Sequence, residues 1–138
     1  MTSPVFLDTS GAIALLHRGD VHHAKATQLA AGLMSQRRPR ITTTAVLAEL
    51  GDGFARKGRW SIASRFLSAL LMDPLVTVAT VDPELVSRAC DLRNARTDKE
   101  WGLTDCLSFV VMADNGVDEA FTADHHFQQA GFRALLLQ

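Results

Sequence analysis

The chain has 138 residues, of which 47% are apolar and 21% are charged, a composition that suits one folded domain and argues against disorder. The longest apolar runs are far shorter than the roughly 18–20 residues of a membrane span, and no signal peptide is visible, so we expect a cytoplasmic protein without membrane contact. The formal net charge of −1 excludes a generally basic nucleic-acid-binding surface, and two cysteines are too few for a disulfide scaffold.

The first third of the chain is predicted to hold one strand and two helices. The apolar run Pro4–Leu7 stops abruptly at Asp8, which is typical of a strand that gives way to a helix. The pattern that follows predicts a short helix over Ala12–Leu16. Asp20 has a side chain suited to an N-cap, and it is expected to start a second helix that continues to about Ser35.

The middle of the chain repeats the order of strand and helix. Arg40–Thr43 has the composition of a short strand, and Thr43 or Thr44 is suited to cap the amphipathic helix that follows. Another amphipathic helix is predicted over Trp60–Leu71. The next strand is expected over Leu75–Ala79.

The last third begins with the strongest helix start in the chain. Asp82, Pro83 and Glu84 place an acid at the cap, a proline at the first position and an acid in the first turn. This helix is expected to run to about Arg96. Four further elements are predicted after it: a helix from within Trp101–Asp105 to Asn115, a strand over Glu119–Thr122, a brief helix around His126–Ala130 and a strand over Ala134–Leu137.

The order of these elements predicts the fold class. Strands and helices alternate and the loops are short, which favours an α/β fold with a mainly parallel central sheet of four to five strands and helices on both faces. The helix that ends near Asn115 is apolar nearly all round, so we expect it deep inside the protein. No internal repeat or linker is visible, and residues 1–138 are expected to form a single domain.

Four acids are placed to meet at one edge of this sheet. Asp8 and Asp124 directly follow predicted strands, and the carboxyl ends of parallel strands form the edge where ligands bind. Glu49 lies at the margin of the buried face of its helix. Asp105 lies in the first turn of the most apolar helix, where the helix dipole favours a negative charge.

A cluster of carboxylates needs a positive charge to persist. Two like charges about 4 Å apart repel by about 4 kcal/mol at an effective dielectric constant near 20. All-oxygen ligands suit hard cations, so we expect Mg²⁺ or Mn²⁺ as the counter-ion. An ion held by carboxylates, with positions left open for water, is a recurrent means of hydrolysing phosphodiesters. The alternative for each acid taken alone is a solvated surface group or a helix cap.

Several segments resemble the PIN-domain family, and the resemblance extends from the first predicted strand to the last. The most specific segment is Leu103–Phe109, which reads Leu-Thr-Asp-Cys-Leu-Ser-Phe, and the next is Thr122–Phe127, which reads Thr-Ala-Asp-His-His-Phe. The others are Phe6–Ser10, Thr44–Leu50 and Gly131-Phe132. The resemblance implies a parallel-sheet α/β fold and a metal-dependent ribonuclease.

The resemblance also implies partners. PIN domains of this size are mostly VapC-type toxins of bacterial or archaeal type II toxin–antitoxin systems. A toxin of this type is expected to cleave RNA, to form a homodimer and to be inhibited by a cognate antitoxin protein encoded beside it.

The acidic quartet of the family falls on Asp8, Glu49, Asp105 and Asp124 in this sequence. The resemblance assigns these four residues both as metal ligands for Mg²⁺ or Mn²⁺ and as the catalytic residues. A metal-activated water would attack the RNA phosphorus, so products with a 5′-phosphate and a 3′-hydroxyl are expected.

Further residues are assigned supporting roles on the same resemblance. Thr9, Thr104 and Asp98 match positions beside the acidic residues of the family. One departure is Gly102, where related sequences often have serine. Glycine is only a few tenths of a kcal/mol poorer than serine as a helix cap, so the site should survive this change.

The basic residues gather in three groups: Arg37, Arg38 and Arg40; Arg56, Lys57, Arg59 and Arg65; and Arg88, Arg93, Arg96 and Lys99. Flanking RNA phosphates would be held by such residues, and the first group is the best candidate. The alternative for each group is a solvated surface.

Two other functions have to be weighed against a nuclease. A catalytically silent PIN-like module could bind RNA or a protein without cleaving it. A receiver domain or a phosphatase of the haloacid dehalogenase type also places an aspartate after its first strand. The phosphatase needs a second acid two residues later, where this chain has Ser10, and the paired acids and late lysine of a receiver are not evident.

Histidines and tryptophans offer weaker signals. His22-His23 and His125-His126 lack the partners of a zinc site, so we expect surface or loop residues, with a substrate contact beside Asp124 as the alternative. Trp60 and Trp101 could stack on a base, but packing is the more common role for tryptophan.

Overall fold

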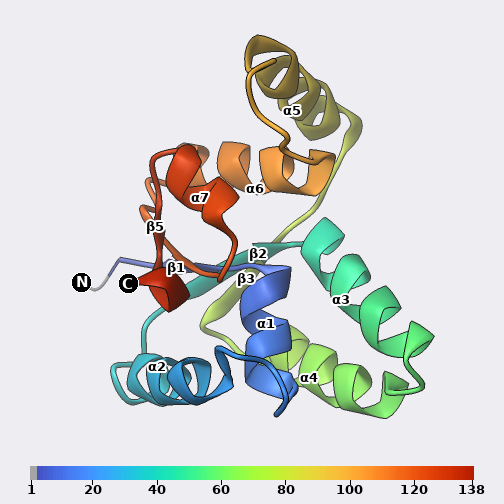
Figure 1. Cartoon of the computed structure of the whole chain (residues 1–138), viewed down its shortest axis with the longest axis vertical. Helices are drawn as coiled ribbons and strands as arrows, with labels where there is room; N and C mark the ends of the chain where they lie inside the picture. The colour runs from blue at the N-terminus through green and yellow to red at the C-terminus, as the bar shows by residue number, and fades with distance from the viewer. Residues whose placement is uncertain (1–2) are drawn as a thin grey trace.

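A five-stranded parallel sheet forms the centre of the computed structural model, which describes residues 3–138 (Figure 1). The strands lie in the order β3-β2-β1-β4-β5, and every neighbouring pair is parallel. This arrangement confirms the predicted fold class. The strands are β1 (Val5–Leu7), β2 (Arg40–Thr43), β3 (Val76–Ala79), β4 (Glu119–Phe121) and β5 (Arg133–Ala134).

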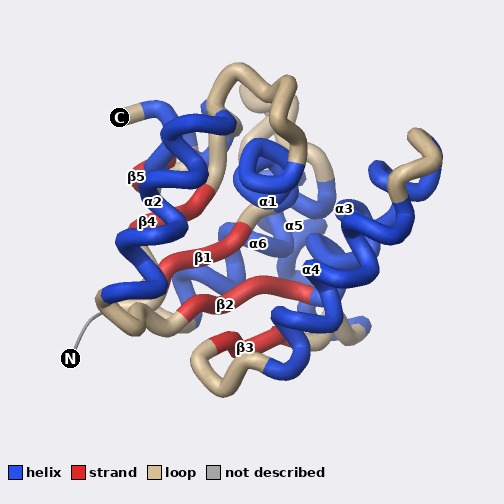
Figure 2. Tube along the Cα trace, turned by 90° about the horizontal axis from the view of Figure 1, so that it is seen from below, coloured by secondary structure: helices blue, strands red, loops and turns tan. Residues whose placement is uncertain are grey.

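Helices cover both faces of the sheet (Figures 1 and 2). One face carries α1 (Thr9–Leu16), α2 (His23–Ser35) and α4 (Trp60–Met72), and α3 (Thr44–Arg56) joins the end of β2 to α4. The other face carries α5 (Pro83–Ala95), α6 (Leu103–Asp114) and the short α7 (His125–Gln129). Within residues 3–138, no helix combines the length and the apolar character that a membrane crossing requires.

The sheet separates two apolar clusters, because successive side chains of a strand point to opposite faces. In β1, Phe6 belongs to the cluster under α5 and α6, whereas Val5 and Leu7 belong to the cluster with α1 and α4. Each fully buried side chain of this size contributes about 1.5–3 kcal/mol to folding. The α6 segment Cys106–Met112 is buried at every position, including the polar Ser108, as its almost entirely apolar pattern predicted. Trp101 is also buried and packs edge-on against Phe109, so its role is packing.

The chain changes direction at β1, and this change defines a position in the sheet. From β1 it crosses to β2 and β3 on one side, and then it returns to β4 and β5 on the other. The crevice between the carboxyl ends of β1 and β4 is therefore the topological switch point. In open α/β sheets, ligands bind at this point.

The predicted boundaries of three elements are wrong: the start of α1, the start of α2 and the end of the last strand. Helix α1 begins at Thr9 because the Asp8 side chain caps it. Helix α2 is preceded by His22, since Asp20 accepts the His22 N–H in the turn before the helix. The predicted strand Ala134–Leu137 ends after one residue and continues as a 3₁₀ helix over Leu135–Leu137. That turn buries the adjacent Leu135 and Leu136 in the same cluster, which an extended strand cannot do.

A candidate metal centre at the carboxyl ends of the strands

Asp8 is a buried carboxylate at the end of β1. Only 5% of the residue is exposed, and its Oδ2 accepts hydrogen bonds from the hydroxyl of Thr122 at 2.7 Å and the hydroxyl of Ser10 at 2.9 Å. Each hydroxyl also accepts a backbone N–H, Ser10 from Ala123 and Thr122 from Asp124. These N–H groups occupy hydroxyl lone pairs, so the hydroxyl protons are directed at Asp8.

The pKa of Asp8 shows what burial does to this carboxylate. Loss of solvent raises the pKa from 3.8 to about 6, against the hydrogen bonds of Thr122 and Ser10, which lower it. The negative charge of Asp105 adds to this rise in the pKa of Asp8. A cation between the two acids would favour the ionised form of Asp8.

A continuous set of polar contacts joins Asp8 to two further carboxylates, Asp124 and Asp105. Thr122 contacts Asp8 through its hydroxyl proton, and the same hydroxyl accepts the N–H of Asp124. Asp124 Oδ1 accepts the backbone N–H of His126 at 2.9 Å and lies 3.4 Å from its Nδ1. The same Nδ1 lies 3.0 Å from Asp105 Oδ2.

Each of these three carboxylates uses one oxygen for contacts with the protein. Asp8 uses Oδ2, Asp105 uses Oδ2 for the N–H of Gly102 at 3.1 Å and for His126, and Asp124 uses Oδ1. The second oxygen of each acid takes part in none of these bonds. Carboxylate oxygens are the donor type that hard divalent cations prefer. The chemistry of these residues therefore fits a magnesium or manganese ion.

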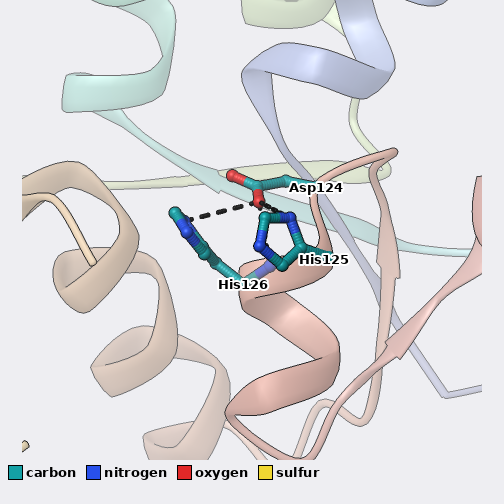
Figure 3. A group of neighbouring side chains, drawn as sticks. All are labelled: Asp124, His125 and His126. Carbon is teal, nitrogen blue, oxygen red and sulfur yellow. Dashed lines mark hydrogen bonds and ion pairs between the residues drawn. The ribbon is translucent and has the colours of Figure 1, made fainter. Parts of the chain in front are cut away.

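His126 is the site residue that sequence patterns indicate only weakly. His125 is exposed, whereas the imidazole of His126 lies between Asp105 and Asp124 and is half-buried. Ligand atoms of Asp124, His125 and His126 all lie within 4.8 Å of one another. Figure 3 shows both imidazole rings beside the Asp124 carboxylate. The Nδ1 of His126 contacts both Asp124 and Asp105, whereas that of the exposed His125 lies 3.7 Å from Asp124 alone, so His126 is the ring that acts here as a partner of the carboxylates. In the sequence, the role of His126 was indicated only by its position two residues after Asp124.

The structure does not connect Glu49 to this network. Glu49 lies on the exposed side of α3, and no hydrogen bond or ion pair within residues 3–138 engages its carboxylate. Helix α3 starts at the same edge of the sheet as Asp8, because it directly follows β2, which is parallel to β1, and Thr43 caps it through the N–H of Val46. The assignment of Glu49 as a ligand stays a prediction.

The three supporting residues have different surroundings. Thr9 is buried, and its hydroxyl has no hydrogen-bond partner within the described residues. Thr104 is half-buried in the first turn of α6. Asp98 is exposed in the loop between α5 and α6, where it pairs with Arg96 and Lys99. The roles predicted for these residues stay predictions.

The arginines predicted to hold RNA phosphates lie at the opposite edge of the sheet from the carboxylates. Arg40 is at the start of β2, beside Val5 at the start of β1, and it pairs with Asp73 at 2.5 Å. Arg38 pairs with Glu119 at 3.0 Å, and Arg37 precedes both in the loop before β2. The structure does not bring these three residues to the site. They lie at the amino-terminal ends of the parallel strands, and the length of the strands separates them from the carboxylates at the other ends.

Comparisons with known proteins identify the family of this chain. The family model for the PIN domain matches residues 5–133. Two curated relatives from Mycobacterium tuberculosis, strains CDC 1551 and H37Rv, are both named 23S rRNA-specific endonuclease VapC20. They are 30% identical to the chain over 132 residues, which cover 93% of the chain and 95% of each relative.

A solved structure shows the same fold. The crystal structure of Mycobacterium tuberculosis VapC20, described as a sarcin–ricin loop cleaving toxin, matches the chain with a TM-score of 0.81 and 29% sequence identity. The match covers 93% of this chain and 95% of that one.

Proposed function

The chain belongs to the PIN-domain family, and from that premise we propose that it is a metal-dependent endoribonuclease that acts as the toxin of a toxin–antitoxin pair. One observation carries the proposal. Asp8, Asp105 and Asp124 are joined through Thr122 and His126 into one polar network at the topological switch point, and the hydrogen bonds of each carboxylate within residues 3–138 engage one oxygen. Burial raises the pKa of Asp8 to about 6, and a nearby cation would stabilise its ionised form, which supports a metal ion at this position.

The residues of the chain have distinct tasks in the proposed site. Asp8 and Asp105 would hold the ion, with Asp124 and Glu49 completing its shell directly or through water. The hydroxyls of Ser10 and Thr122 orient Asp8, and the Nδ1 of His126 orients Asp105. When bound, a divalent ion activates water and stabilises negative charge on a phosphate.

The proposed reaction needs no side-chain nucleophile. A water oxygen bonds to phosphorus, the bond from phosphorus to the 3′ oxygen breaks, and that oxygen gains a proton. The products carry a 5′-phosphate and a 3′-hydroxyl. The names of the relatives make 23S rRNA the substrate to test first. An antitoxin protein and a second copy of the chain are the proposed partners.

We expect the purified protein to cut RNA only when a divalent ion is supplied. Intact ribosomes and protein-free total RNA are incubated with Mg²⁺, with Mn²⁺ or with EDTA, and the 5′ ends of the products are mapped. Cleavage with either ion, lost in EDTA, supports the proposal. Cleavage in EDTA contradicts the metal assignment, and RNA binding without turnover would support the catalytically silent module.

Replacing His126 with Ala is expected to weaken Mn²⁺ binding about 10- to 100-fold, as loss of residues that orient metal ligands usually does. The variant leaves Asp105 Oδ2 with only the Gly102 N–H. Titration calorimetry on the folded proteins measures the affinity. His125→Ala is the matched control, because His125 is exposed and lies 3.7 Å from Asp124. Equal Mn²⁺ affinity in both variants would show that His126 does not position the ligands.

A further inference from the structure

We propose that His17, Lys57 and Arg59 form a phosphate-binding subsite for the RNA strand as it leaves the carboxylates. We call these three residues the basic subsite, and the proposal rests on the proposed function. They come from the end of α1, the end of α3 and the start of α4, and all three line one pocket between these elements.

The basic subsite contains cations that have no acidic partner. Elsewhere in the described chain, five arginines form ion pairs: Arg38 and Arg133 with Glu119, Arg40 with Asp73, Arg88 with Asp114 and Arg96 with Asp98. Five others in this part of the chain form none: Arg18, Arg37, Arg56, Arg65 and Arg93. Within residues 3–138, no ion pair engages Lys57 or Arg59. Both side chains are exposed, so they are available to an anion from solution.

The contact between Arg59 and His17 adds a second donor. Arg59 Nη1 lies 2.8 Å from His17 Nδ1, and a guanidinium can only donate hydrogen bonds. His17 Nδ1 therefore accepts, and the ring proton lies on Nε2. The helix dipole accounts for a cation at the end of α3, but it does not account for a guanidinium held against an imidazole. An anion that accepts hydrogen bonds from these side chains would satisfy the arrangement.

A glycine keeps the space between these side chains open. The three residues line a pocket together with Ile13, Gly53 and Phe54. A Cβ at Gly53 would meet no atom within 4 Å, so packing does not require a glycine. Glycine inside a helix costs about 1 kcal/mol relative to alanine. The missing side chain leaves room in the groove between α1 and α3.

The position of the basic subsite favours RNA over an acidic protein segment. Helices α1 and α3 both begin at the carboxyl edge of the sheet, and they pack against each other. His17 follows Asp8 by nine residues and Lys57 follows Glu49 by eight, so the subsite lies about 12 Å farther along the helices. An RNA strand bound at the carboxylates would therefore carry its neighbouring phosphates along this groove.

The test compares two double variants that each remove two positive charges. Lys57→Ala/Arg59→Ala removes cations of the basic subsite, whereas Lys25→Ala/Arg133→Ala removes them elsewhere. For RNA cleavage with Mg²⁺, we expect the subsite variant to raise KM about tenfold and to change kcat less than twofold. Binding of a labelled single-stranded RNA in EDTA is measured against salt, and the slope should fall by about 0.7 for each phosphate that the variant no longer neutralises.

A third variant tests the groove without a change of charge. Gly53→Leu places a side chain in the open space and should raise KM as well, with an unchanged or higher melting temperature. The proposal of the basic subsite is contradicted if the wild type cleaves RNA and the two double variants have the same KM and the same salt slope. If the wild type does not cleave RNA, the proposed function fails, and the salt slopes still decide whether the subsite binds RNA.

Discussion

Replacing Asp105 with Asn is expected to lower RNA cleavage at least about a thousandfold, equivalent to about 4 kcal/mol of transition-state stabilisation. The asparagine side chain keeps an oxygen that can accept the Gly102 N–H, so α6 should still begin at Leu103. It removes the charge that would bind the cation. Initial rates with Mg²⁺ on the mapped RNA substrate measure the loss, and circular dichroism confirms the fold.

Asp114→Asn is the matched control for this prediction. Asp114 lies at the other end of α6 and pairs with Arg88 on the surface, where an ion pair contributes little to stability. We expect this variant to cleave RNA within about twofold of the wild-type rate. Activity of Asp105→Asn close to that of the control would contradict the assignment of Asp105 as a metal ligand.

Asp8→Asn is expected to be more stable than the wild type at neutral pH in the absence of metal. The pKa of Asp8 in the folded protein is about 6, above its ordinary value of 3.8, so the folded state binds the proton more tightly than the unfolded state. The stability of the metal-free wild type should therefore fall as the pH rises from about 4 to about 6. The loss is about 3 kcal/mol, and the variant lacks this titration.

Urea unfolding in EDTA at several pH values between 4 and 7 measures this difference. The stability of the variant relative to the wild type should increase over this interval and then become constant. A saturating concentration of Mn²⁺ at pH 7 should stabilise the wild type and leave the variant unchanged. A constant difference from pH 4 to pH 7 would show that burial does not raise the pKa of Asp8.

Local patterns in the sequence predicted most of the fold. The cap at Asp82-Pro83 starts α5 as expected, and the almost entirely apolar segment Cys106–Met112 forms the most buried helix. The predicted elements failed where neighbours decide the conformation, as at Leu135–Leu137, where two adjacent leucines enter one apolar cluster. Such failures are expected because local propensity contributes little free energy compared with burial.

Part of the candidate site could be predicted from the sequence, and the rest was decided by the tertiary structure. The sequence shows which residue types stand at the ends of strands, and parallel pairing then requires Asp8 and Asp124 to share one edge. The sequence does not show that the hydroxyls of Thr122 and Ser10 both bind Oδ2 of Asp8, or that His126 lies between Asp105 and Asp124. Likewise, clustering along the chain favoured Arg37, Arg38 and Arg40, which the sheet places at its amino-terminal edge.

The sequence by itself therefore determined the local features of this protein, which depend on a residue and its immediate neighbours. These features are the strands, the helix caps, the apolar helix faces and the acids that follow a strand. Contacts between side chains that are far apart along the chain were decided by the tertiary structure alone. Asp8 and Thr122 are 114 residues apart and His126 and Asp105 are 21 apart, yet each pair is within hydrogen-bond distance. These contacts depend on the order and the register of the strands, which no single segment of the chain encodes.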